Sequence, residues 1–421
     1  MPLQEAFQTV TQGALLAPNA LQQALFPRLM TQDTGLLIPT GPGAGRLEAI
    51  FIPSIVGMRT DRQAHRLFII GPDGGPLDDY VYRLGPYLRA LVIADGAERT
   101  IWFEEPGRTP LARTYQADGS VLNGVANHPF DSQVDVVVMP LAHFRRHFFA
   151  TGGVHGVPEA LAFDRESAHE MAPRGLFYFD EAFGADREDQ LDFMRLVEFL
   201  FAQDLDVVVG GASLPASASE AMAFLETVAL PEAQRAPRRG LCMTAVSENA
   251  LVDAMEREAR RGYAAGGRVV VALSDPADPR LSELHARLER SPAGDVLLYR
   301  SADSRAVRGS VYARARALEK AGESYLMVTD GPAIEAADLD ASLLVTEPCT
   351  PLSLVRRAGR CNRRWESPDA LVHVVGDVRA AAAADRLAPA GRRTDGIVAA
   401  YESAAAAETA FDAGVWTPLI L

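Results

Sequence analysis

The chain has 421 residues, 48% of them hydrophobic, and a formal net charge of −14. A chain of this size and apolar content is expected to form two to three globular domains, each with its own core. Its three cysteines form no CxxC pair, which argues against a disulfide framework or a zinc site. The acidic balance disfavours nonspecific binding to nucleic acid but leaves room for a local basic groove.

The N-terminal stretch MPLQEAFQTVTQ has no basic start followed by an apolar core, so it does not read as a signal peptide. No apolar run reaches the roughly 18 residues that would span a bilayer. We therefore expect a cytoplasmic protein with no membrane partner.

Short apolar runs alternate with helical stretches along the whole chain. The first series of runs lies at 35–39, 66–70, 89–95, 134–140, 175–180 and 206–211. The second series lies at 268–274, 295–301, 324–330, 341–347 and 370–377. Continuous apolar strands that alternate with helices predict an α/β fold, with mostly parallel sheets covered by helices on both faces.

The polar segment LPEAQRAPRRG (230–240) separates the two series. We place the domain boundary there, which gives a first α/β domain over 1–232 and a second over 233–385. The Ala-rich remainder, 386–421, is predicted to form a short helical tail that packs on the second domain.

The stretch IPTGPGAGRLEA (38–49) follows the first apolar run and opens like a phosphate-binding loop. Such a loop needs a lysine beside a Ser or Thr, and Arg46 and Leu47 stand in those places. In an alignment without a two-residue insertion, Ala44 and Gly45 stand there instead. The candidate nucleotide-binding residues of the loop are Thr40, Gly41, Gly43, Gly45 and Arg46.

The run GLFYFD ends in the acidic pair Asp180-Glu181. Ligands of open α/β sheets bind at the carboxyl ends of strands. An acidic pair in that position suits nucleotide hydrolysis, with Asp180 holding Mg²⁺ and Glu181 orienting or deprotonating water. The alternative is a helix N-terminus whose acids favour the helix dipole.

The stretch SLVRRAGRCNRR (353–364) places Arg357, Arg360 and Arg363 three residues apart. At the start of a helix, this spacing would aim the guanidinium groups at one place. Fixed cationic forks suit the charge that develops on a transferring γ-phosphate. The alternatives are a solvated basic face and a patch that contacts nucleic-acid phosphates.

Taken in order, the motifs PTGPGAGRLEA, DEAF, GASLP, EAADLD and RRAGRCNR resemble those of the superfamily 2 helicases. They are most similar to the helicase part of the CRISPR-associated helicase–nuclease of type I systems. That family shows PTGxGKTEA, a DEAH-type box, SATLP, E-x-x-LD-x-D and QRxGRxxR. In addition, PLDDYVYRLGPYL (76–88) resembles the family's first nucleic-acid-contacting motif.

The resemblance implies two tandem RecA-like domains that bind ATP and Mg²⁺ between them. It implies that Asp180 is the metal ligand, that Glu181, Arg360 and Arg363 are catalytic, and that Arg357 contacts the nucleotide. Within NALQQAL (19–25), Gln22 is the better candidate for the glutamine that reads adenine. The implied partners are single-stranded or displaced-strand DNA and the subunits of a CRISPR effector complex.

Each motif departs from the family pattern. The loop lysine is absent, Phe183 replaces the His of DEAH, Arg356 replaces the Gln of the arginine motif, and Gly-Ala-Ser replaces Ser-Ala-Thr. None of the eight histidines precedes an Asp, so the His-Asp doublet of an HD nuclease is missing. We predict a degenerate helicase-like protein that acts with a type I effector complex in antiviral defence, with weak or lost ATPase activity. The alternative is an active ATP-dependent DNA translocase that works with a separate HD nuclease.

His143 and His147 lie four residues apart in LAHFRRHFF and could face one way on a helix. A metal pair is one interpretation. A structural role is favoured, because no acidic or third ligand lies nearby in the sequence.

Overall fold

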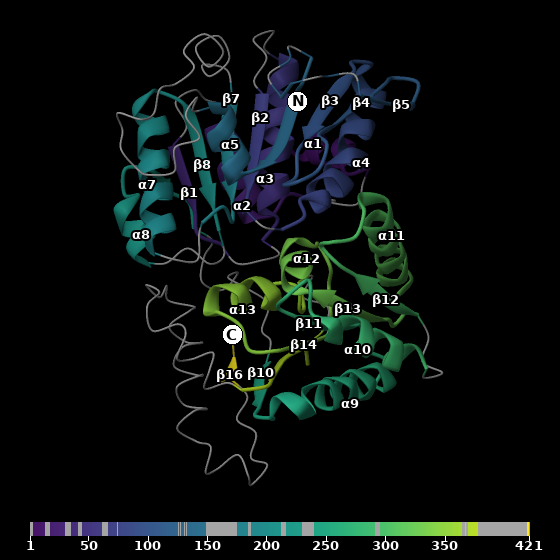
Figure 1. Ribbon diagram of the computed structural model, residues 1–421. Helices are drawn as coiled ribbons and strands as arrows, with labels where there is room; N and C mark the ends of the chain where they lie inside the picture. The colour runs from purple at the N-terminus through teal and green to yellow at the C-terminus, as the bar shows by residue number, and fades with distance from the viewer. Residues whose placement is uncertain are drawn as a thin grey trace. The chain divides into compact units, whose positions relative to one another are not determined.

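The computed structural model describes most of the chain in separate stretches. These are residues 3–12, 17–29, 35–40, 44–60, 66–73, 75–124, 126, 128–129, 131, 133–148, 175–183, 187–211, 216–229, 240–290, 295–363, 367, 369–377 and 419–420. The chain divides into two compact units, Met1–Arg235 and Ala236–Leu421 (Figure 1).

The first unit is built on a nine-stranded sheet with the order β5-β4-β3-β6-β2-β7-β8-β1-β9. Neighbouring strands from β3 to β9 run parallel, and β4 and β5 add an antiparallel edge. The strands are β1 (Gly35–Ile38), β2 (Arg66–Gly71), β3 (Arg99–Phe103), β4 (Leu111–Tyr115), β5 (Val121–Asn123), β6 (Val136–Pro140), β7 (Gly175–Asp180), β8 (Asp206–Gly210) and β9 (Glu226–Thr227).

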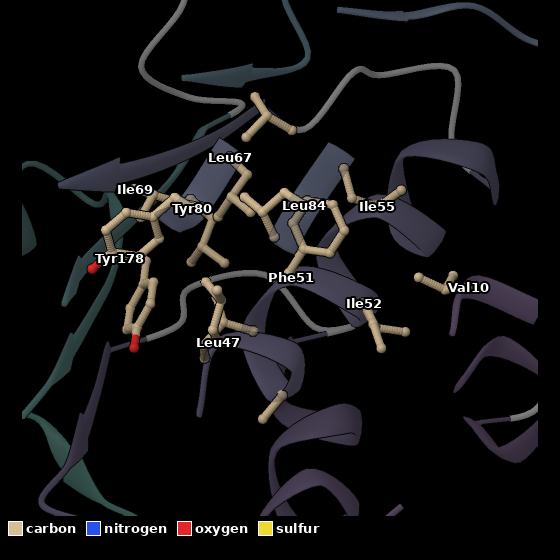
Figure 2. Packing of buried hydrophobic residues seen from close by; sticks show 14 of the residues in the cluster. Val10, Leu47, Phe51, Ile52, Ile55, Leu67, Ile69, Tyr80, Leu84 and Tyr178 are labelled. Atoms are coloured by element: carbon tan, nitrogen blue, oxygen red, sulfur yellow. The ribbon is translucent and has the colours of Figure 1, made fainter. Parts of the chain in front are cut away.

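Alternate residues of these strands enter two separate hydrophobic cores, because successive side chains of a strand point to opposite faces. One core joins the sheet to α1 (Leu3–Val10), α2 (Ala20–Leu29), α3 (Arg46–Thr60) and α4 (Asp78–Asp95). Figure 2 shows part of it, including Leu47, Tyr80 and Tyr178. The other core joins the opposite face to α5 (Leu141–Phe148) and α7 (Arg187–Ala202). A short helix, α8 (Ala216–Ala221), follows β8.

The second unit is built on a seven-stranded sheet with the order β12-β13-β11-β14-β15-β10-β16. All neighbouring strands run parallel except the β10–β16 pair. The strands are β10 (Gly240–Thr244), β11 (Val269–Leu273), β12 (Val296–Tyr299), β13 (Leu326–Asp330), β14 (Leu343–Thr346), β15 (Leu371–Val375) and β16 (Leu419–Ile420).

Helices also cover this second sheet. A short 3-10 helix, η4 (Glu248–Ala250), leads into α9 (Leu251–Ala264). The sheet packs against α9 and α10 (Pro279–Glu289) through one hydrophobic core. α12 (Gly331–Ala336) contacts β11 and β13, and α11 (Arg305–Ala321) contacts β12. α13 (Pro351–Ala358) begins at Thr350, whose hydroxyl caps the helix by accepting from the Ser353 amide.

Ten of the eleven predicted strands form, and the prediction at 89–95 was wrong. That run belongs to α4, where Leu84, Leu88, Leu91 and Val92 are fully buried on one face at helical spacing. Gly96, with a φ of 73°, ends the helix in the left-handed conformation. Six strands were not predicted, namely β3, β4, β5, β9, β10 and β16.

The predicted helical tail lies almost entirely outside the described residues. Its described part, Leu419–Ile420, is a strand that pairs with β10, so the helical prediction was wrong there. Among the helices of the described ranges, none is long and apolar enough to cross a membrane.

Candidate functional site

Arg46 lies at the start of α3, and its guanidinium group contacts both residues of the acidic pair. Its Nη2 lies 2.9 Å from Oδ1 of Asp180 and 2.8 Å from Oε1 of Glu181. All three side chains are largely buried. The structure therefore brings together three residues that the sequence pointed to, Arg46 on the glycine-rich loop and the two acids at the end of β7.

Two tyrosines complete this cluster. Tyr178 lies two residues before Asp180 on β7 and donates a 2.7 Å hydrogen bond to Oδ1 of Asp180. Tyr80, on α4, donates a 2.8 Å hydrogen bond to Oδ2. Both carboxylate oxygens of Asp180 thus accept hydrogen bonds from the protein itself. The sequence analysis missed both tyrosines.

Arg46 uses most of its hydrogen-bonding capacity inside the cluster. Nη1 donates to the Thr40 carbonyl at 2.8 Å, and Nε donates to the Tyr178 hydroxyl at 3.3 Å. Burial alone would lower the pKa of Arg46, but Asp180, Tyr178 and Glu181 raise that pKa well above its ordinary value. Burial, and then the charge of Asp180, raise the pKa of Tyr80 and of Tyr178. The guanidinium is therefore permanently charged and the tyrosines remain donors.

Gln22 and Asn19 hold the end of the glycine-rich loop. The Asn19 amide donates to Oε1 of Gln22, and the Gln22 amide donates to Oδ1 of Asn19, both at 2.9 Å. This is a reciprocal cap at the start of α2. Asn19 Nδ2 then donates to the Ala44 carbonyl at 3.0 Å, and Gln22 Nε2 donates to the Gly45 carbonyl at 3.4 Å. The carboxamide of Gln22, predicted to read adenine, is occupied by protein partners.

The backbone around the cluster is close-packed. Gly45 has a φ of 72°, and a Cβ there would lie 2.7 Å from Gln22 Nε2. A Cβ at Gly210, on β8, would lie 3.0 Å from the Tyr178 ring and 3.1 Å from Arg46 Cδ. Glu181 itself has a φ of 53°, a left-handed conformation that non-glycine residues rarely adopt. Gly41 and Gly43, also predicted to bind nucleotide, lie outside the described residues.

The residues around Asp180 do not fit the Mg²⁺ that a hydrolytic site of this kind requires. Asp180 accepts three hydrogen bonds within the cluster, and Arg46 stands against both acids. Leu47, in the place of the metal-binding hydroxyl, is only 3% exposed and belongs to the hydrophobic core. In addition, no group of three His, Cys, Asp or Glu side chains in the described stretches is arranged to hold a metal ion.

In the second unit, Arg357 is a buried structural cation. Nε lies 3.1 Å from Oε1 of Glu335, Nη1 donates to the Thr346 hydroxyl at 2.8 Å, and Nη2 donates to the Ser274 hydroxyl at 3.1 Å. Burial would lower the pKa of Arg357, but Cys349 and Glu335 raise it above its ordinary value. The whole guanidinium is used inside this unit.

Arg360 and Arg363 lie beyond the end of α13, so the prediction that the three arginines sit at a helix start was wrong. The reason is that Thr350 and Pro351 start the helix well before them, and it ends at Ala358. Arg360 donates to the carbonyls of Ile334 and Glu335, and Arg363 Nε lies 2.5 Å from Oδ1 of Asp338. All three arginines therefore converge on residues 334–338 of the same unit.

His143 and His147 share one acid that sequence proximity did not reveal. Glu104 follows β3, and its two carboxylate oxygens lie 2.9 Å from His143 Nδ1 and 2.8 Å from His147 Nε2. Burial would raise the pKa of Glu104, but the two histidines hold it below its ordinary value. The pair thus ties α5 to the end of β3.

Two units that each carry a mostly parallel sheet covered by helices confirm the predicted fold of two tandem RecA-like domains. The comparisons with solved structures show this fold. S. cerevisiae Dbp5 bound to RNA and ADP BeF3 aligns with a TM-score of 0.60 and 12% identity, over 95% of this chain and 90% of its own. T. fusca Cas3 with ATP aligns with a TM-score of 0.60 and 18% identity, over 90% of this chain and 48% of its own.

A third solved structure, the Mycobacterium smegmatis helicase Lhr bound to ssDNA and AMP-PNP, aligns with a TM-score of 0.59 and 15% identity. That alignment covers 90% of this chain and 48% of Lhr. The chain thus spans about half the length of the Cas3 and Lhr chains. No protein-family model matches the sequence, and no curated protein matches it.

Proposed function

We propose that this chain is a helicase-like protein that binds nucleic acid and acts with a type I CRISPR effector complex in antiviral defence, with weak or lost ATP hydrolysis. The observation that carries the loss of hydrolysis is the double ion pair of Arg46 with Asp180 and Glu181. Hydrolysis needs one of these acids for the metal and the other for water. A guanidinium that holds both withdraws them from both tasks.

The arginines of the second unit support the same proposal. A transferring phosphate is stabilised by a cation whose N–H groups point at it. Arg357, Arg360 and Arg363 instead direct N–H groups at residues of their own unit. Catalytic roles for Arg360 and Arg363 would require these contacts to break first.

The nucleic-acid and CRISPR parts of the proposal draw on the motif order and on the solved structures. Helicases of this fold have been solved bound to RNA, DNA and ssDNA. The two T. fusca Cas3 structures share 17% and 18% identity with the chain, whereas Dbp5, MrfA and Lhr share 10% to 15%. Identities this low support the fold alone, so the CRISPR part of the proposal rests on the motif order.

The test of the catalytic part is an ATPase assay with and without single-stranded DNA, run beside Glu181→Gln. We expect that DNA does not stimulate ATP turnover by the wild type. We also expect that this turnover does not exceed the turnover of Glu181→Gln. Glu198→Gln, an exposed acid on α7, is the matched control for loss of one charge. DNA-stimulated turnover that Glu181→Gln abolishes and Glu198→Gln retains would instead establish the active translocase.

The test of the partner is a native-gel binding assay with a purified type I effector complex on its target DNA. We expect the chain to join the complex that carries displaced single strand and to ignore the free duplex. Equal binding to effector-bound and bare DNA would contradict the CRISPR role while leaving nucleic-acid binding in place.

A further inference from the structure

We infer that the Arg46 guanidinium has taken the place of the divalent cation, so that the acidic pair binds no metal while the ion pair is closed. This inference rests on the proposed function, because it concerns the same two acids. It goes further by naming what fills the site. It also predicts that removing one side chain will expose a latent cation site.

Most acceptor positions of Asp180 are already occupied by the protein. An ionised carboxylate offers about four lone-pair positions. Oδ1 accepts from Arg46 and Tyr178, and Oδ2 accepts from Tyr80. Three of these positions are therefore taken and about one is left, on Oδ2. A single remaining position suits Mg²⁺ poorly, because Mg²⁺ demands near-octahedral geometry with retained waters.

The Arg46 guanidinium would also repel a metal ion bound to Asp180. A metal ion on Oδ1 of Asp180 would lie close to the guanidinium, which is already 2.9 Å from that oxygen. Like charges at such distances repel strongly where little water screens them. A lysine ammonium is a compact point charge on a flexible stem, whereas the planar fork of arginine donates in fixed directions. Here one nitrogen, Nη2, serves two carboxylates at once, which fixes the fork in place.

The net charge of the cluster also disfavours binding of a nucleotide phosphate. One guanidinium and two carboxylates leave the cluster with a formal charge of −1. Without an added cation, a nucleotide phosphate would meet a negative site and would be repelled. The chain would therefore use its helicase-like surfaces without nucleotide at this position.

The test measures binding of Mn²⁺ alone to the full chain by electron paramagnetic resonance, in which bound Mn²⁺ loses its free signal. We expect no site of this kind in the wild type. Arg46→Ala should bind one Mn²⁺ at least about tenfold more tightly than the wild type, a gain that converts to ~1.4 kcal/mol or more. Arg46→Lys should show a smaller gain, because its ammonium keeps a positive charge but does not bridge both acids in fixed directions. Adding Asp180→Asn to either variant should abolish the new site.

Arg83→Ala is the matched control, because Arg83 is a buried cation of the same unit that pairs with a different acid, Glu48, at 2.7 Å. It should create no site that depends on Asp180. Arg46→Lys keeps a positive charge beside the acids, so it serves if Arg46→Ala does not fold.

Two results would overturn the inference. One is a wild-type Mn²⁺ site that Asp180→Asn removes, and the other is the absence of any new site in the folded Arg46 variants. Either result can occur in a protein that does not hydrolyse ATP. The failure of this inference is therefore distinct from the failure of the proposed function, which the ATPase assay decides.

Discussion

The hydroxyl of Tyr80, on α4, donates a hydrogen bond of 2.8 Å to Oδ2 of Asp180, at the end of β7. This hydrogen bond joins residues that are one hundred positions apart in the chain. It ties α4 to the acidic pair at the end of β7. Tyr80 is only 8% exposed, so water does not readily replace its hydroxyl.

Tyr80→Phe should lower the free energy of unfolding by about 1.5–3 kcal/mol, because hydrogen bonds to charged groups are worth about this much. Urea denaturation of the variant and the wild type measures the loss. Tyr87→Phe is the control, since its hydroxyl lies at a longer 3.3 Å from Oε1 of Glu48. Equal losses in the two variants would show that the short bond to Asp180 has no special weight.

Gly45→Ala should destabilise the chain more than Gly96→Ala does. Both glycines have a positive φ, 72° and 73°, so each substitution incurs the left-handed penalty of about 1–2 kcal/mol. A Cβ at Gly45 also meets Gln22 Nε2 at 2.7 Å, whereas a Cβ at Gly96 meets nothing within 4 Å. Comparing the thermal unfolding of the two variants isolates the clash with Gln22. Identical shifts in melting temperature would argue against the contact of Gln22 with the glycine-rich loop.

Glu104→Gln should remove a pH-dependent contribution to stability. Because the folded-state pKa of Glu104 is below its ordinary value, its contribution is complete above the unfolded pKa of about 4.3. It is lost as the pH falls through the lower, folded pKa. The wild type should thus exceed Glu104→Gln in urea midpoint at pH 7, and the difference should shrink on acidification below pH ~4. A difference that persists unchanged at acid pH would contradict the contact that Glu104 makes with both histidines.

Arg357→Met should destabilise the second unit by about 3–5 kcal/mol, because it leaves buried polar partners unpaired. Arg287→Met is the control, since Arg287 pairs with Asp253 and Glu283 on the exposed surface and should cost less than about 1 kcal/mol. Hydrogen exchange resolved by peptide measures both effects in the second unit. A small loss for Arg357→Met would show that its partners find water instead.

The fold was largely predictable because buried parallel strands are continuous apolar runs. The run at 89–95 failed as a strand because periodicity alone does not tell a short apolar run of a helix from that of a strand. In α4 it is buried on one face only, and Ile93 is 58% exposed. β4 and β5 were missed for a different reason. They form an antiparallel edge in which β4 alternates half-buried and buried residues and β5 is exposed, with Val121 and Leu122 at 40% and 44%.

The candidate site was predictable in part. Arg46, Asp180 and Glu181 follow from motifs, and Tyr178 was open to discovery because it lies two residues before Asp180 on one face of a strand. Tyr80 and Glu104 carry no such signal, since only the tertiary fold brings them to their partners. The chain has 40 arginines and one lysine, Lys320. An arginine at position 46 therefore does not by itself indicate whether the residue has a function. Its geometry does, because one nitrogen bridges two acids.

Leu47 makes the glycine-rich loop costly to change. It lies beside Arg46 and packs in the first core, where Figure 2 shows it near Tyr80 and Tyr178. Restoring the hydroxyl of a metal-binding loop at this position would remove a buried side chain at a cost on the order of 2 kcal/mol. Restoring lysine at position 46 would give up the bridge between two buried acids. Each of the two substitutions is therefore expected to cost stability by itself, so separate interactions retain Arg46 and Leu47 in this loop.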